Sequence, residues 1–274
     1  MIWIKNAIIT ACDAKYGDFL VNHWLRSLKE NVNLNNTEIV IFDYGLDDHH
    51  LSFLKKEDVI IIKGVKDGHI TCVRFRDMSN YLSKRHYEQV MCTDGGDIIF
   101  QTDISSLLNI NKDNFRVVVE DINIVGKLYT EKYFKKKDEI KIKKLLVNKN
   151  PINAGFIIGP ADKFRDLCKS AFDLIEKKEK FGPDQVAINY LLYSQKNFVI
   201  LDNKYNFLIW TTNQDFYIKQ GGFYLKNGEK ISVVHNAGRF NKLRFIKNFG
   251  YGSGFNEIVK SKYLIRKFLI WFLR

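Results

Sequence analysis

The residues best suited to chemistry are two aspartates separated by two glycines, Asp94-Gly95-Gly96-Asp97. They follow the short apolar run 90–92, and the apolar pattern resumes at 98–100. Such a run, ended by glycines and acids, is typical of a buried strand whose carboxyl end opens into a loop. Two carboxylates there, with glycines that let a phosphate approach the backbone, suit a hard divalent cation shared with a phosphorylated ligand. A tight turn with two solvated acids is the alternative.

The composition indicates a folded protein with an excess of positive charge. The chain has 274 residues, is 46% hydrophobic with only three prolines, and carries a formal net charge of +12. That charge suits nucleic acid, an anionic membrane or acidic substrates. No signal peptide and no apolar run of ~18 residues occurs, so we expect a cytoplasmic protein. The cysteines lack a CxxC spacing and predict buried apolar side chains rather than disulfides or a zinc site: Cys12, Cys72, Cys92 and Cys168.

Apolar periodicity alternates between strands and helices along most of the chain. Strands are expected at 7–12, 38–42, 58–62, 90–92, 116–120, 152–159, 198–201, 205–210 and 232–235, and helices at 16–30, 47–55, 74–85, 162–178 and 183–193. This alternation favours an α/β fold with a mostly parallel, doubly wound sheet. Ligands of such sheets bind beyond the carboxyl ends of the strands, where the two aspartates lie. We expect one domain over 1–253 and a distinct tail over 254–274.

Two segments concentrate the basic residues. Residues 128–149 contain eight lysines, which fit either a solvated helix or mobile insertion, or a surface that meets an anionic acceptor or membrane. On a helical wheel the tail divides into a basic half with Lys260, Lys262, Arg266, Lys267 and Arg274, and an apolar half with Leu264, Ile265, Phe268, Leu269, Trp271 and Phe272. Such a helix is typical of the membrane interface, and docking on the protein's own core is the alternative.

Three further motifs follow the aspartates in order. They are Pro151-Ile152-Asn153-Ala154-Gly155-Phe156, Gly182-Pro183-Asp184-Gln185 and Val233-Val234-His235-Asn236-Ala237-Gly238. Together with the acidic loop they resemble the retaining glycosyltransferases of the GT-A fold, in the family that holds glycogenin and the bacterial lipooligosaccharide galactosyltransferases. The resemblance runs from Ala7 to about Lys242, and the tail also fits the bacterial branch.

The resemblance implies a nucleotide site after the first strand. The family's acidic turn corresponds to Cys12-Asp13-Ala14-Lys15-Tyr16, with Tyr16 stacking on a uracil and Asp13 accepting a hydrogen bond. A helix cap at Asp13 with Tyr16 packed inward is the structural alternative. The family's arginine before the metal loop, which contacts the sugar or diphosphate, corresponds best to Arg76, and Arg74 is the second candidate.

The resemblance also implies a metal site for Mn²⁺ or Mg²⁺. In the family pattern, Asp-any-Asp precedes apolar residues, and Asp97 aligns with its second aspartate. Asp94 lies one residue too early, so either the loop has gained a glycine and Asp94 still reaches the ion, or Asp97 binds alone; we favour the first. His235 is the family's third ligand, although a histidine that ends an apolar strand is often structural.

The remaining implied roles concern the sugar and the leaving group. Asn153 and Ala154 line the sugar pocket, where an amide can bracket hydroxyl groups. Gln185 faces the anomeric carbon and Asp184 binds a sugar hydroxyl, unless Asp184 only complements the positive end of its helix. The last set, Gly238 with Lys242 or Arg239, contacts the diphosphate.

The sequence therefore predicts an enzyme that transfers a hexose from a nucleotide diphosphate sugar, in particular a UDP-sugar, to a glycan or glycolipid in cell-surface polysaccharide synthesis. The resemblance implies retention of configuration. The tail predicts a position at the inner face of the cell membrane, in contact with anionic lipid. The alternatives are a sugar-phosphate nucleotidyltransferase, which would have a basic glycine-rich loop after the first strand, and a non-catalytic basic protein that binds membrane or nucleic acid. We expect no nucleic-acid partner.

Overall fold

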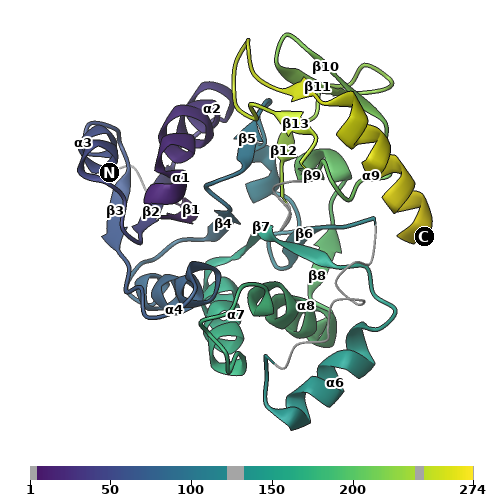
Figure 1. Ribbon diagram of the computed structural model, residues 1–274. Helices are drawn as coiled ribbons and strands as arrows, with labels where there is room; N and C mark the ends of the chain where they lie inside the picture. The colour runs from purple at the N-terminus through teal and green to yellow at the C-terminus, as the bar shows by residue number, and fades with distance from the viewer. Residues whose placement is uncertain (1–4, 122–132, 238–243, 274) are drawn as a thin grey trace.

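The computed structural model describes residues 5–121, 133–237 and 244–273, and the side chains up to residue 269. Its centre is a seven-stranded sheet in the order β3-β2-β1-β4-β7-β6-β8 (Figure 1). The strands are β1 (Asn6–Cys12), β2 (Thr37–Asp43), β3 (Ile60–Lys63), β4 (Gln89–Thr93), β6 (Phe115–Val119), β7 (Ile152–Pro160) and β8 (Phe198–Ile200). Within the described ranges, no helix is long and apolar enough to cross a membrane.

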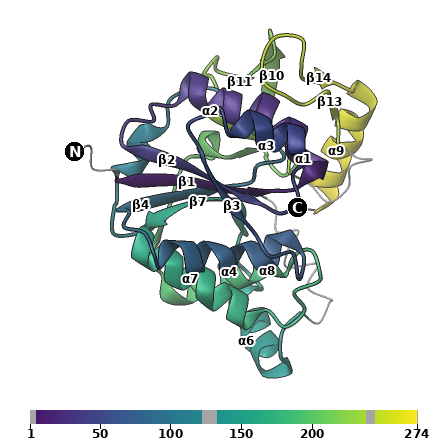
Figure 2. The ribbon, with the colours of Figure 1, turned by 90° about the vertical axis from the view of Figure 1, so that its left-hand side faces the viewer.

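Helices cover both faces of the sheet, which makes three layers (Figure 2). On one face lie α1 (Ala14–Phe19), a π-helical segment (Leu20–Leu25), α2 (Arg26–Asn31) and α3 (Asp48–Leu54); on the other lie α4 (Ile70–Leu82), α7 (Ala161–Leu174) and α8 (Pro183–Gln195). Successive strand residues point to opposite faces, so Ile9 joins the core under α4 and α7 while Ile8 joins the core under α1 and α2. The strands are continuous apolar runs because both faces are buried.

The α/β prediction is confirmed, and the sheet is mostly parallel. Strand β7 is its exception, because it runs antiparallel to both β4 and β6. A second sheet of very short strands lies beside the first: β5 (Ile98–Phe100), β12 (Val233–His235) and β9 (Phe207–Leu208). It brings the acidic motif beside the histidine motif. Strands were expected at 205–210 and 232–235, but their pairing with residues 98–100 in a separate sheet was not predicted.

The remaining elements are small, and several of them enclose a third apolar core. They are the 3₁₀ turns Ser105–Leu108 and Asn203–Tyr205, the hairpin β10 (Phe216–Lys219) and β11 (Gly222–Leu225), the pair β13 (Ile246–Lys247) and β14 (Glu257–Ile258), and the helices α6 (Lys136–Leu146) and α9 (Lys260–Leu273). Helix α6 packs on α8 through Ile142 and Leu146, and its lysines are exposed. Residues 128–132 of the predicted lysine-rich segment lie outside the described residues.

The C-terminal helix divides differently from the helical wheel. Arg266, expected on the basic solvent face, is buried, and it donates hydrogen bonds to the carbonyl oxygens of Trp210 and Thr212. Because the long Arg266 side chain reaches these two carbonyl oxygens and Tyr263 packs against the third apolar core, α9 docks on the protein through these two residues. The exposed fractions of Leu264, Ile265 and Phe268 are 65%, 50% and 64%. The side chains of Trp271, Phe272 and Arg274 lie outside the described residues.

Candidate active site

The acidic loop and the histidine motif meet where β5 pairs with β12. The register sets His235 opposite Ile98, and the Asn236 N–H donates to the Asp97 carbonyl at 2.9 Å. This pairing brings the His235 imidazole against the loop, with Nε2 at 3.2 Å from Asp97 Oδ1 and 3.8 Å from Asp94 Oδ2. One ligand atom from each of the three side chains lies within 4.8 Å of the other two. The cluster has the donor set of a divalent-cation site.

Asp94 joins this cluster although it is out of register with the family pattern. Its N–H donates to the Gly155 carbonyl at 2.9 Å, which holds the start of the loop against β7. The two glycines then carry the backbone around to Asp97, and Gly96 lies so close to the Tyr16 ring that a Cβ there would meet it at 2.7 Å. The loop with its additional glycine thus folds back and directs both carboxylates inward.

Gly155 explains why the Asn-Ala-Gly motif needs a glycine. A Cβ at this position would lie 2.5 Å from Asp94 Oδ2 and 2.6 Å from His235 Cε1. Real Cβ atoms do not approach other atoms so closely, so any side chain at residue 155 would push the Asp94 carboxylate and the imidazole apart. The glycine of the motif therefore leaves room for the acidic cluster.

The His235 imidazole is prepared to act as a metal ligand. Its Nδ1 lies 3.0 Å from Asn206 Oδ1, and because an amide oxygen only accepts, Nδ1 carries the hydrogen. Among the described residues, the buried Nε2 has no hydrogen-bond partner despite its nearness to Asp97. A lone pair held beside two carboxylates is what a divalent cation requires. The three residues fit such an ion.

Charges around the cluster set the pKa values of its members. Burial lowers the pKa of His235, but the carboxylates of Asp97 and Asp94 outweigh burial and raise it. Burial raises the pKa of Asp97, yet His235 and Arg244 hold it below its usual value. Arg244 Nη2 lies 3.4 Å from Asp97 Oδ2. The cluster thus mixes carboxylates with positive groups, and a cation held between Asp97 and His235 would require the neutral imidazole.

Arg74, not Arg76, reaches the cluster. Its guanidinium is buried, with Nη1 2.5 Å from Asp94 Oδ1 and Nη2 3.6 Å from Asp184 Oδ2. Burial alone would lower the pKa of Arg74, but Asp94 and Asp184 outweigh it and raise the pKa. Arg76 instead binds Asp67 and Asp77 at the surface.

A chain of buried amides links the imidazole to Gln185. Asn206 Nδ2 donates to Asn153 Oδ1 at 3.1 Å, and Asn153 Nδ2 donates to Glu120 Oε1 at 3.3 Å. Gln185 Nε2 donates to the same carboxylate oxygen at 3.0 Å. Burial raises the pKa of Glu120. The Gln185 amide is therefore oriented through its nitrogen by a carboxylate, and it is connected to the residue that holds the His235 tautomer.

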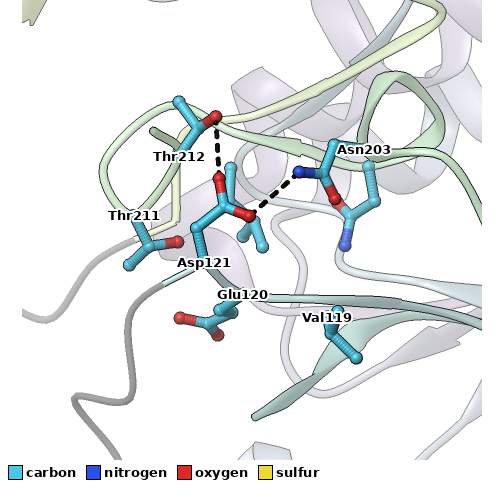
Figure 3. Close-up of a pocket in the computed structure, with 8 residues that line it drawn as sticks. Val119, Glu120, Asp121, Asn203, Thr211 and Thr212 are labelled. Atoms are coloured by element: carbon cyan, nitrogen blue, oxygen red, sulfur yellow. Dashed lines mark hydrogen bonds between the residues drawn. The ribbon is translucent and has the colours of Figure 1, made fainter. Parts of the chain in front are cut away.

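Glu120 and Asn206 were not predicted from the sequence. Glu120 directly follows β6, so its position at the carboxyl edge of the sheet could have identified it as a candidate site residue. Nothing in the local sequence pattern identifies Asn206. Figure 3 shows the neighbouring residue Asp121 tied to Asn203 and Thr212, with hydrogen bonds of 3.1 and 3.4 Å. These bonds anchor the end of β6, from which Glu120 extends to Gln185.

Asp184 and Gln185 begin α8, where Pro183 occupies the first turn. Asp184 is buried, and burial raises its pKa although the Arg74 charge opposes this. Because its carboxylate faces Arg74, Asp184 does more than complement the helix terminus. Ala154 is buried in β7 beside Asn153.

The expected nucleotide turn lies at the carboxyl end of β1. Asp13 precedes α1 but makes no capping hydrogen bond, and its Oδ2 lies 3.1 Å from Lys66 Nζ. Tyr16 is half-buried against Gly96, next to the acidic loop. Cys12 is buried, which raises the pKa of its thiol to about 12. All four cysteines are buried, as predicted. Gly238, Arg239 and Lys242 lie outside the described residues.

An open α/β sheet, with carboxylates, an imidazole and buried amides at its carboxyl edge, defines a glycosyltransferase domain of the GT-A type. The sequence model of Glycosyl transferase family 8 matches residues 68–241, and the chain belongs to this family. The protein is a glycosyltransferase, and the resemblance inferred from its motifs is confirmed. No curated protein matches the chain significantly.

Proposed function

We propose that this glycosyltransferase moves a hexose from a UDP-sugar to a hydroxyl of a glycan or glycolipid acceptor in cell-surface polysaccharide synthesis, with retention of configuration. The observation that carries the proposal is the meeting of three groups in one place. The carboxylate–imidazole cluster suits a diphosphate-bound cation, Arg74 supplies a fixed positive charge, and Gln185 is held beside them on the start of α8. Family membership supports a sugar donor over the nucleotidyl transfer considered as an alternative.

Departure of the nucleotide diphosphate is the demanding step, because negative charge builds on its bridging oxygen. Asp94, Asp97 and His235 would hold Mn²⁺ or Mg²⁺, and the ion would supply positive charge that stabilises the leaving diphosphate. Arg244, paired with Asp97, brings a second guanidinium to the cluster. The chain thus offers fixed charges that need no reorganisation when the bond breaks.

Retention requires a way to stabilise positive charge on the anomeric carbon. The Glu120 carboxylate holds the nitrogen of the Gln185 amide, so the carbonyl oxygen, which bears partial negative charge, is left for the sugar. In the proposed reaction the acceptor attacks from the face of the leaving group. The departing phosphate oxygen then takes the acceptor's proton. Asp184 and Asn153 would bind sugar hydroxyls and orient the ring.

The acceptor is proposed to lie at a membrane surface. A groove of about 550 Å³ adjoins the cluster at Gly96 and Asn236 and extends to Lys262 on α9. On that helix, Leu264, Ile265 and Phe268 form an exposed apolar strip, here called the α9 strip, and Lys260 and Lys267 are exposed nearby. An apolar strip with flanking lysines suits the interface of an anionic membrane. This arrangement favours a lipid-linked acceptor at the inner face of the cell membrane.

The function is tested by measuring nucleotide release from a panel of nucleotide sugars with Mn²⁺, Mg²⁺ or excess chelator. We expect release of a nucleoside diphosphate that needs the metal, and a thermal shift with the matching donor, since a ligand raises apparent stability by mass action. Release of pyrophosphate would instead identify a nucleotidyltransferase. Full turnover in chelator would contradict the metal assignment, and the anomeric configuration of the product decides retention.

The α9 strip gives a test of membrane binding that preserves the helix. Replacing Leu264, Ile265 and Phe268 together with serine is expected to release the protein from vesicles that contain anionic lipid, because about 1.5–3 kcal/mol of transfer free energy is lost for each large apolar side chain. Donor hydrolysis should persist, since Arg266 and Tyr263 still dock the helix. Exposed Phe53, on α3, provides the control Phe53→Ser. Unchanged vesicle binding of the triple variant would remove α9 from the proposal.

A further inference from the structure

A second group of metal-binding side chains joins α1 to α3, apart from the catalytic cluster. Asp18 lies on α1, and His49 and His50 lie on α3. Asp18 Oδ1 is 3.0 Å from His50 Nε2 and 3.7 Å from His49 Nε2. The two imidazole rings lie against each other with their centroids 3.8 Å apart. One ligand atom from each residue lies within 4.8 Å of the other two.

The His50 ring is fixed by close packing. Its side chain is only 4% exposed, and it lies against Gly17, where a Cβ would meet the ring at 2.3 Å. A glycine inside a helix destabilises that helix relative to alanine. Its presence here is explained by the space that it leaves for the His50 ring. Gly17 admits the imidazole between the two helices. Asp18, the next residue on α1, then carries its carboxylate to the ring nitrogen.

The other ring nitrogen of His50, Nδ1, lies near a carboxylate, as does the nitrogen that faces away from the metal in many metal-binding histidines. Nδ1 is buried without a hydrogen-bond partner among the described residues, and Asp47 Oδ2 lies 3.9 Å away. Histidines that bind metal through one nitrogen usually donate the other N–H to a carboxylate. Metal on Nε2 would keep the hydrogen on Nδ1, on the side of Asp47, whose carboxylate would have to move closer to accept it.

We propose that Asp18, His49 and His50 form a zinc site that clamps α1 to α3. Two imidazole nitrogens with one carboxylate oxygen are the donors that Zn²⁺ prefers over Mg²⁺ or Ca²⁺. With bonds of about 2.0 Å, the ligands of a tetrahedral ion lie about 3.3 Å apart, and the observed 3.0 and 3.7 Å lie on either side of that value. His49 and Asp18 are exposed, so the fourth position is open to water.

The clamp would act on the nucleotide end of the molecule. Helix α1 begins directly after Asp13 and carries Tyr16, which packs against the acidic loop. A metal bond between α1 and α3 would restrict motion of the turn that holds these residues. The site is distinct from the catalytic cluster, which uses a different loop and a different histidine.

The test is equilibrium dialysis of the untagged full chain against Zn²⁺, followed by metal analysis. The chain should carry Asp97→Asn, so that the catalytic cluster is disabled. We expect one tightly bound Zn²⁺ per chain and a higher melting temperature with Zn²⁺. Adding Asp18→Asn or His49→Ala should weaken binding at least about tenfold and abolish the thermal shift. Asp48→Asn removes an exposed charge from the same helix and should change neither.

Substituting Co²⁺ for Zn²⁺ reports the geometry directly. A tetrahedral site gives much stronger visible absorption than hydrated, octahedral Co²⁺, and this absorption should vanish in the His49→Ala chain. The proposal fails if Zn²⁺ does not bind, or if binding and thermal shift survive both Asp18→Asn and His49→Ala. Because the readouts are metal content, absorption and melting temperature, the result is independent of the proposed sugar transfer.

Discussion

Asp97→Ala is expected to lower kcat/KM for sugar transfer by about 1,000-fold and to remove metal-dependent donor binding. The loss corresponds to about 4 kcal/mol of transition-state stabilisation, at about 1.4 kcal/mol for each factor of ten. Asp97 is the carboxylate nearest the imidazole, and its departure would also leave Arg244 without this partner. The decisive measurement is calorimetric titration of the nucleoside diphosphate at fixed Mn²⁺ with the wild-type and variant proteins.

Asp97→Asn and Asp113→Ala complete the comparison. The first keeps the volume and removes the charge, so it should be nearly as severe if a cation is bound. The second removes an exposed aspartate elsewhere and should leave kcat/KM unchanged.

Asp94→Ala should approach the effect of Asp97→Ala, because its carboxylate reaches the same cluster. His235→Ala should impair Mn²⁺ more than Mg²⁺, since imidazole suits the softer ion. Wild-type turnover of Asp97→Ala would overturn the whole metal site.

The central sheet could be predicted from the sequence because its strands are buried on both faces. Each such strand is an apolar run with a polar boundary, and the intervening helices repeat at their own period. The small sheet was predicted only in part: strands were expected over β9 and β12, but β5, β9 and β12 contain only two or three residues each, too few to indicate how they pair. The antiparallel direction of β7 could not be predicted either, because an apolar run is the same whether the strand is parallel or antiparallel to its neighbours.

Arg74 and Arg76 illustrate what a motif alone does not fix. Two residues apart on a helix, they point about 200° away from each other, so only one can face the cleft. The helix begins at Ile70, after His69, and this phase turns Arg74 inward. The sequence placed the start of the helix four residues later. Spacing relative to the acidic loop then favoured Arg76, whereas packing of α4 against α7 and the sheet decides the inward face.

Glu120 and Asn206 show the same limit for the candidate site. Their importance arises from partners that are distant along the chain, Gln185 and His235 respectively. Residue types at motif positions suggested the groups that are proposed to touch substrate or metal. The groups that orient them became visible only when the sheet edge assembled, because a hydrogen bond between side chains depends on a register that the sequence does not state.

Gln185→Ala is expected to lower kcat by about 10- to 1,000-fold with little change in KM. The reason is that its carbonyl oxygen is proposed to stabilise charge that exists only in the transition state, and such a group contributes little to ground-state binding. Steady-state kinetics with the matching donor measures both constants. Gln195→Ala, at the exposed end of the same helix, is the control. A normal kcat for Gln185→Ala would exclude Gln185 from the mechanism.

Glu120→Gln separates the orientation of Gln185 from its mere presence. The substitution preserves volume and can keep an acceptor oxygen opposite Gln185 Nε2, but it removes the negative charge that strengthens this contact. If Glu120 positions Gln185, kcat should fall while KM and the Mn²⁺ titration stay near wild type. A parallel loss of metal binding and melting temperature would instead mean that Glu120 only supports the buried chain through Asn153 and Asn206 to His235. Because Gln185→Ala leaves that chain intact, the two variants together distinguish a positioning carboxylate from a structural one.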